Sequence, residues 1–112
     1  MSSEAVERRT FSARLDCHYL LRPAAEGDGS TLLVAALHGF GSNPEVMLRL
    51  TEGLLGPRPV IAAIQAPSQF FLGAGNPDSD VGYCWATHKH SASSIRLHHE
   101  MLLYVFNEAG RR

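Results

Sequence analysis

Two apolar runs of strand length, with a helical pattern between them, constrain the fold of this chain most strongly. Residues 31–37 read "TLLVAAL" and residues 59–67 read "PVIAAIQAP". Between them Asn43 can cap a helix, Pro44 suits its first position, and Gly56 can end it. This order predicts a parallel strand–helix–strand unit with a right-handed crossover, and therefore an α/β fold.

The strand expected at 31–37 differs from the one that precedes it. It is apolar on both faces, which predicts a central strand covered by helices on both sides. Residues 10–21 instead alternate apolar and polar side chains, which is typical of a strand with one solvated face. The Pro- and Gly-containing residues 22–30 then predict a turn that joins the two strands as an antiparallel hairpin.

The second half of the chain predicts a long connection and a last helix. Residues 68–91 are rich in Gly, Pro, Asn and Asp, which favours an irregular segment of a length that is commonly functional. Residues 93–109 carry Ile95, Leu102, Val105 and Phe106 on one helical face, which predicts a helix. With 112 residues we expect one domain.

Charge and composition narrow the possible partners. The formal net charge of −1, from 10 Lys+Arg and 11 Asp+Glu, gives no reason to expect nucleic acid or an anionic membrane. Charged residues in "MSSEAVERRTF" occupy the place where a signal peptide needs an apolar region, and no run approaches about 18 apolar residues. We therefore expect a cytoplasmic protein without a membrane span, with Cys17 and Cys84 as reduced thiols.

The turn "HGFGSNP", residues 38–44, has three interpretations. It could be a plain strand-to-helix turn in which Gly39 and Gly41 permit unusual backbone angles. It could bind a nucleotide or phosphate at the helix start, although it lacks the third glycine of a dinucleotide fingerprint and the next strand ends without an acidic residue. It could also be an oxyanion loop, in which backbone N–H groups stabilise the tetrahedral intermediate of ester hydrolysis.

Three features together resemble a known family. "HGFG" follows a buried strand, "QAP" follows the next one, and Trp85 lies in a long segment before an amphipathic helix. This pattern is similar to that of the phospholipase/carboxylesterase family of α/β hydrolases, which includes the acyl-protein thioesterases, over about residues 32–110. The resemblance implies a carboxylic ester or thioester hydrolase without a metal or cofactor.

The resemblance also implies a partial fold and roles for individual residues. The fold would be the amino-terminal half of an α/β hydrolase, an incomplete single domain over residues 1–112: an antiparallel hairpin, a parallel strand–helix–strand unit and a further helix, lacking the nucleophile-elbow strand. The backbone N–H of Phe40 would donate into the oxyanion hole, Gly39 and Gly41 would shape the bend, and His38 would brace the loop and not act as the catalytic base. Residues that could line the acyl pocket, or simply anchor the long segment in the core, are Phe70, Phe71, Leu72 and Trp85.

The nucleophile of the family is missing from the chain. It is a serine in a Gly-x-Ser-x-Gly elbow, and no serine here has that frame, so we expect the chain alone to be inactive. "GYCWA", residues 82–86, resembles the cysteine elbow of dienelactone hydrolases and would make Cys84 the nucleophile. Because "GNPDSD" precedes it instead of a buried strand, we do not expect that role for Cys84.

Histidines near the carboxyl end raise the possibility of a zinc site. His88, His90, His98 and His99 lie close in sequence, but no Cys or His partner stands at a spacing typical of zinc ligands. We therefore expect no metal site and a solvated or supporting role for these side chains.

One sheet edge should lack a neighbour. In α/β hydrolases the strand with the oxyanion loop lies between its crossover partner and the elbow strand, so strand 31–37 would be unpaired on one side. An open apolar strand promotes aggregation unless it is covered. We expect cover by self-association, by a partner chain carrying the remaining half, or by residues of a longer protein. The alternative function is a non-catalytic interaction module, or one half of a split or oligomeric hydrolase, that uses this edge.

Overall fold

The computed structural model describes residues 5–25, 32–73, 80–85 and 89–109. The elements follow the order β1 (Tyr19–Arg22), β2 (Leu33–Leu37), α1 (Pro44–Leu55), β3 (Val60–Ile64), β4 (Ser68–Phe71), β5 (Val81–Cys84) and α2 (Ser91–Ala109). β1, β3 and β2 form one sheet, and β4 with β5 forms a second, two-stranded sheet. The molecule is therefore a small mixed α/β domain.

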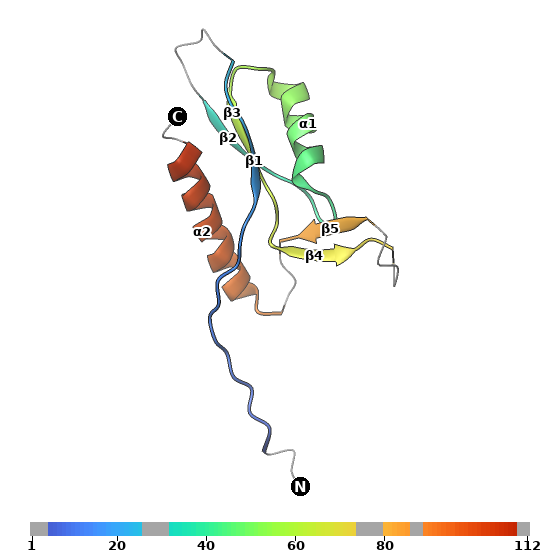
Figure 1. Ribbon diagram of the computed structural model, residues 1–112, viewed down its shortest axis with the longest axis vertical. Helices are drawn as coiled ribbons and strands as arrows, with labels where there is room; N and C mark the ends of the chain where they lie inside the picture. The colour runs from blue at the N-terminus through green and yellow to red at the C-terminus, as the bar shows by residue number, and fades with distance from the viewer. Residues whose placement is uncertain (1–4, 26–31, 74–79, 86–88, 110–112) are drawn as a thin grey trace.

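The three-stranded sheet lies between the two helices. β3 is central, β2 runs parallel to it with Leu33 opposite Val60, and β1 runs antiparallel to it with Tyr19 opposite Ile64. Figure 1 shows α1 on one side of this sheet and α2 on the other. The parallel strand–helix–strand unit predicted from the two apolar runs is confirmed, and so are helices on both faces of β2.

The predicted hairpin between the first two strands is wrong. β1 pairs with β3 and not with β2, so β3 takes the central position that the sequence suggested for residues 31–37. The physical reason is burial, because all five residues of β3 are buried whereas β2 keeps Leu37 exposed. A strand that is apolar on every side gains most when it has a neighbour on both edges and a helix on both faces.

The core has one layer on each face of the sheet. On the α2 face, Ala62 and Ile64 of β3 pack against Met101 and Val105. On the α1 face, the buried residues are Ala36, Ile61 and Ala63, with Met47 and Leu48 of α1 packed against them. The alternation of β3 side chains thus divides its residues between the two helices.

The ends of α1 follow the sequence signals. Asn43 caps the helix, and its side-chain Oδ1 accepts a hydrogen bond of 2.9 Å from the Val46 N–H. Gly56 ends the helix at φ +72°, a backbone conformation that favours glycine. On one flank of the helix, Glu52 lies 3.4 Å from Arg22 of β1.

The segment predicted to be irregular contains a hairpin. β4 and β5 pair antiparallel, with Phe71 opposite Val81 and Ser68 opposite Cys84. In the sequence, apolar residues flank a stretch rich in Gly, Pro, Asn and Asp, which is a pattern typical of a hairpin. Residues 74–79 and 86–88 lie outside the described residues.

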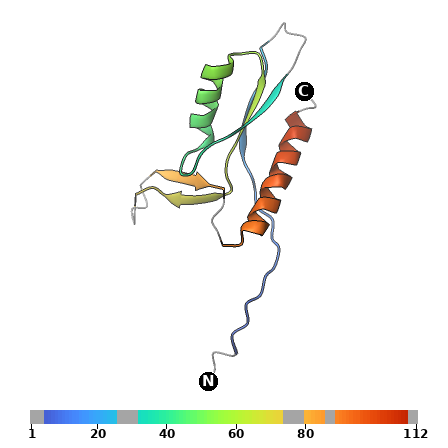
Figure 2. The same ribbon diagram turned by 180° about the vertical axis from the view of Figure 1, so that it is seen from behind.

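The predicted strand over residues 10–21 is much shorter in the structure. Only Tyr19–Arg22 pairs, while residues 5–18 extend away from the sheet with exposed side chains (Figure 2). Alternation alone does not hold a strand, which needs a neighbour to receive its backbone hydrogen bonds. Neither helix in the described part of the chain is long and apolar enough to cross a membrane.

Candidate functional site

The turn between β2 and α1 is pinned to the end of the β4–β5 hairpin. The Gly41 N–H donates to the Tyr83 carbonyl at 2.9 Å, and the Tyr83 N–H donates to the Ser42 carbonyl at 3.1 Å. The Ser42 N–H donates back to the Gly39 carbonyl at 3.1 Å. The two backbone segments therefore hold each other in place at the carboxyl end of β2, where parallel sheets usually bind ligands.

The backbone N–H of Phe40 differs from those that follow it. The amides of Gly41 and Ser42 are engaged, but within the described residues no acceptor bonds to the Phe40 amide. Phe40 itself is 78% exposed. A donor without an acceptor, in an exposed residue whose neighbours are held by hydrogen bonds, is what an anion-binding loop requires.

Glycine occurs at positions 39 and 41 of the turn for different structural reasons. Gly41 has φ +75°, and a Cβ there would meet Phe70 at 3.7 Å. Gly39 has no positive φ, and a Cβ there would meet nothing within 4 Å. Gly41 is therefore demanded by the backbone of this turn, whereas Gly39 leaves an open space beside the Phe40 amide.

His38 is buried and uses both ring nitrogens. Nε2 lies 3.0 Å from the Ala66 N–H, which can only donate, and Nδ1 lies 2.8 Å from the Gly39 carbonyl, which can only accept. These partners define a neutral ring protonated on Nδ1. His38 therefore braces the turn against the segment after β3, and neither nitrogen is left to accept a proton from a substrate.

An apolar border lies beside the turn. The rings of Phe40 and Phe70 stack with centroids 5.3 Å apart and planes at 28°. Leu72 approaches Gly41 from the same face of the hairpin as Phe70. Phe71 lies on the opposite face, so the structure brings two of the predicted pocket residues, Phe70 and Leu72, together at the turn and separates Phe71 from them.

Trp85 lies on the inner side of the turn. Its indole Nε1 donates to the His38 carbonyl at 2.8 Å, and its ring lies 5.3 Å from that of His38. It also borders a cavity of about 290 Å³ under α2, lined by Leu37, His38, Ile64, Trp85, His98, Met101 and Leu102. Trp85 therefore supports the loop from beneath and does not share the border formed by Phe40 and Phe70.

Gly82 contributes to the turn although the motif at residues 38–44 does not predict a role for it. A Cβ there would lie 2.7 Å from the Gly41 carbonyl oxygen and 2.8 Å from Leu72. Only a glycine lets β5 approach the turn closely enough for the Tyr83 hydrogen bonds. The sequence signal for Gly82 is its place in "GYCWA", a motif that also resembles a nucleophile elbow.

Within the described residues, Cys84 and the histidines are not brought together in a second site. Cys84 is buried as the last residue of β5 and pairs with Ser68, so it does not stand on a strand-to-helix turn. His98 packs edge-on against Trp85, with ring centroids 5.3 Å apart. His88 lies outside the described residues. Across the ranges that the structure describes, no three His, Cys, Asp or Glu side chains are placed to share a metal ion.

Comparisons of the chain with models of protein families, with curated protein sequences and with solved structures gave no significant match.

Proposed function

We propose that this chain supplies the oxyanion loop of a carboxylic ester or thioester hydrolase of the serine α/β-hydrolase type. The nucleophile would come from residues beyond these 112. The observation that carries the proposal is the amide of the exposed residue Phe40, which has no acceptor among the described residues while the amides of Gly41 and Ser42 are bonded. Such an enzyme would be cytoplasmic and would need no metal or cofactor.

The rigidity of the turn supports this chemistry. A preorganised N–H lowers the barrier because it does not reorient when negative charge develops on the substrate oxygen, and one such donor contributes about 10²–10³ in kcat. The Tyr83 hydrogen bonds on one side and the His38 ring on the other fix the turn. A second donor, from the residue after the nucleophile, would complete the hole.

The surroundings of the turn favour an apolar acyl group. The Phe40 ring stacks on Phe70, Phe70 and Leu72 lie against Gly41, and no charged side chain contributes to the ring stack or to the nearest contacts of Gly41. The acyl chain of a neutral ester or thioester would lie against these rings while its carbonyl oxygen points at the Phe40 amide.

Amide NMR with a carboxylate probe tests the donor directly. Butyrate, a product-like anion, should shift the Phe40 amide resonance in a saturable manner while those of Gly41 and Ser42 move little. Phe40→Ala keeps the N–H and should keep binding through the backbone, whereas Phe40→Pro removes the N–H and should abolish it. Equal butyrate binding by both variants would contradict the proposal.

Activity tests the missing half. The pure chain should not hydrolyse a short aryl ester, because a donor without a nucleophile supplies only part of catalysis. Co-expression with a following or adjacent coding segment that contains Gly-x-Ser-x-Gly should restore turnover. Robust turnover by the pure chain that survives Cys84→Ala would refute the proposal.

A second candidate is a non-catalytic interaction module. It is favoured by the outer edge of β2, which has no neighbouring strand within the described residues and carries only apolar side chains. If the chain has this function, it would pair through that edge and butyrate would leave the Phe40 amide unshifted.

A further inference from the structure

The cavity of about 290 Å³ under α2 lies at the carboxyl ends of β2 and β3, which contribute Leu37 and Ile64 to its walls. Met101 and Leu102 of α2 and the ring of Trp85 make most of the remaining surface apolar. In the described part of the chain, none of the lining residues is an acid, a lysine or an arginine. The cavity therefore suits a neutral and mostly apolar occupant.

The polar side chains of the wall are bonded within the protein, with one exception. Both ring nitrogens of His38 have partners, and the indole Nε1 of Trp85 donates to the His38 carbonyl at 2.8 Å. Nε2 of His98 is buried too, but within the described residues no group bonds to it. A buried nitrogen without a partner costs free energy, so an occupant that offers it a hydrogen bond gains affinity.

The ring of His98 is held by packing and not by a hydrogen bond through Nε2. It lies edge-on to Trp85, with ring centroids 5.3 Å apart and planes at 88°. The terminal torsion of a histidine has broad minima, so the ring can turn toward a new partner. Nε2 of a neutral histidine either donates or accepts, and a hydroxyl group can do the converse in both cases. A hydroxyl is therefore the group that best matches His98.

The volume of the cavity sets the size of the occupant. An apolar cavity of about 150 Å³ binds benzene, and this one is roughly twice as large. Water alone would fill it poorly, because each buried water needs about two to four polar partners and the described wall offers one unbonded nitrogen. A compact body of about six to ten carbon atoms fits this space.

We propose that the cavity binds a small neutral alcohol or phenol. The apolar body of the ligand would lie against Leu37, Ile64 and Met101, and its hydroxyl would bond to Nε2 of His98. Leu37 is 46% exposed, so the wall that it forms reaches the surface and gives the ligand a way in. Such a site combines apolar walls with one polar group that fixes orientation, as small-molecule sites commonly do.

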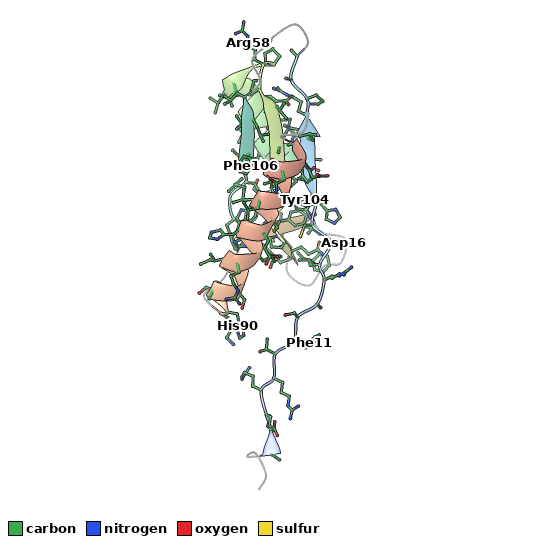
Figure 3. The ribbon with its side chains drawn as sticks, turned by 90° about the vertical axis from the view of Figure 1, so that its left-hand side faces the viewer. Phe11, Asp16, Arg58, His90, Tyr104 and Phe106 are labelled. Carbon is green, nitrogen blue, oxygen red and sulfur yellow. The ribbon has the colours of Figure 1, made fainter. Side chains whose placement is uncertain are left out.

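The cavity is distinct from the hollow between α2 and the amino-terminal segment. Figure 3 shows Tyr104 on the flank of α2 that faces Asp16, and both residues border that hollow. At 100° per residue, Leu102 projects about 200° away from Tyr104, on the other flank of the helix. The alcohol site therefore does not involve the extended residues 5–18.

The alcohol site goes beyond the proposed hydrolase and does not depend on it. His38 and Trp85 line the cavity, whereas the donor proposed for the hydrolase is the backbone N–H of Phe40. Butyrate is charged, and no cationic residue lines the described cavity wall, so butyrate and an alcohol report on different sites. Failure of an alcohol to bind leaves the hydrolase proposal intact, and failure of butyrate to bind leaves the alcohol site intact.

NMR of the full chain tests the site with two probes of similar shape, cyclohexanol and methylcyclohexane. The chain has one tryptophan, so the indole Nε1–H of Trp85 gives a single resonance that reports on the cavity. Both probes should shift this resonance in a saturable manner. His98→Phe keeps an aromatic ring but removes the nitrogen. This variant should weaken cyclohexanol binding about 5- to 10-fold and leave methylcyclohexane binding unchanged.

A matched pair of larger side chains tests the position of the site. Leu102→Phe enlarges a wall residue and should weaken both probes by roughly 10-fold or more. Leu103→Phe makes the same change at the next position, which is 65% exposed, and should leave both affinities unchanged. Circular dichroism checks that each variant is folded.

Three results would overturn the proposal. The first is the absence of a saturable shift of the Trp85 indole with cyclohexanol in the unaltered chain, because the cavity would then hold water only. The second is equal cyclohexanol affinity of the unaltered chain and His98→Phe. The third is an equal effect of Leu102→Phe and Leu103→Phe, which would place binding outside the cavity.

Discussion

The indole Nε1 of Trp85 donates a 2.8 Å hydrogen bond to the carbonyl oxygen of His38, which ties the end of the hairpin to the start of the turn. The two rings also lie 5.3 Å apart with planes at 31°. Residues far apart in the sequence therefore position the loop that carries the Phe40 amide.

Trp85→Phe should destabilise the chain by about 1–3 kcal/mol, because it keeps an aromatic ring but leaves the buried His38 carbonyl without its donor. Urea denaturation followed by circular dichroism measures this change. Phe71→Leu, at a 53% exposed position on the outer face of the hairpin, serves as the control and should change stability by less than about 0.5 kcal/mol. Equal stability of the two variants would mean that the Trp85 hydrogen bond does not hold the turn.

His38 should be observable as a single neutral tautomer. With the Ala66 N–H donating to Nε2 and Nδ1 donating to the Gly39 carbonyl, the ring nitrogen shifts in long-range ¹H–¹⁵N NMR should show Nδ1 protonated and Nε2 unprotonated. His38→Ala should cost about 2–4 kcal/mol, since it removes a buried ring and leaves the Ala66 amide unpaired. The opposite tautomer would contradict the bracing role.

The sequence predicted those features of the fold that depend on residues close to one another in the chain. The cap at Asn43, the end of α1 at Gly56 and the parallel pairing around it all follow from residues within one strand–helix–strand unit. The order of the strands did not follow, because the choice of β3 over β2 as the neighbour of β1 depends on which strand gains most from burial on both edges.

In the candidate site too, the sequence predicted the local turn but not the distant residues that hold it. The motif at residues 38–41 predicted the turn. The residues that fix the turn come from β5 and its flanks, and the Gly-, Pro- and Asp-rich composition of residues 68–91 had predicted an irregular segment there. Tyr83 and Gly82 act through backbone contacts, and a backbone contact leaves no side-chain pattern in a sequence. Phe71 was grouped with Phe70 by adjacency, although neighbours in a strand face opposite sides.

Gly39 and Gly41 should respond differently to alanine. Gly41→Ala forces a side chain into φ +75° and should cost about 1–2 kcal/mol of unfolding free energy. Gly39→Ala meets open space and should cost less than about 0.5 kcal/mol. The pair can be compared in one urea denaturation series. Equal losses would show that the turn does not have the backbone described here.

Gly82→Ala should lower the free energy of unfolding more than Gly39→Ala or Gly41→Ala. Its Cβ would lie 2.7 Å from the Gly41 carbonyl oxygen, and a backbone atom cannot move aside as easily as a side chain. A loss of about 2–3 kcal/mol is expected, with a changed chemical shift for the Gly41 amide. The control is Gly53→Ala on the exposed side of α1, where a Cβ meets nothing within 4 Å. Because alanine favours the helix more than glycine does, this variant should gain about 0.5–1 kcal/mol of unfolding free energy. Tolerance of Gly82→Ala would rule out the close contact of β5 with the turn.

The thiol of Cys17 should react slowly and with a distinct pH dependence. Partial burial raises the pKa of Cys17 above that of an ordinary cysteine, and the neighbouring Asp16 carboxylate raises it further. Only the thiolate is alkylated, so at pH 7–8 a raised pKa lowers the reactive fraction and the rate with iodoacetamide. The alkylation rate of Cys17 should keep increasing with pH beyond the pH at which the rate of an unperturbed thiol has levelled off.

Asp16→Asn removes the repelling charge and should speed alkylation of Cys17 at pH 8 by a few-fold, whereas Asp80→Asn, on the distant hairpin, should not. Buried Cys84 should stay unlabelled in the folded chain, so mass spectrometry should find the label on Cys17 alone. An unchanged rate in Asp16→Asn would show that the carboxylate does not act on the thiol.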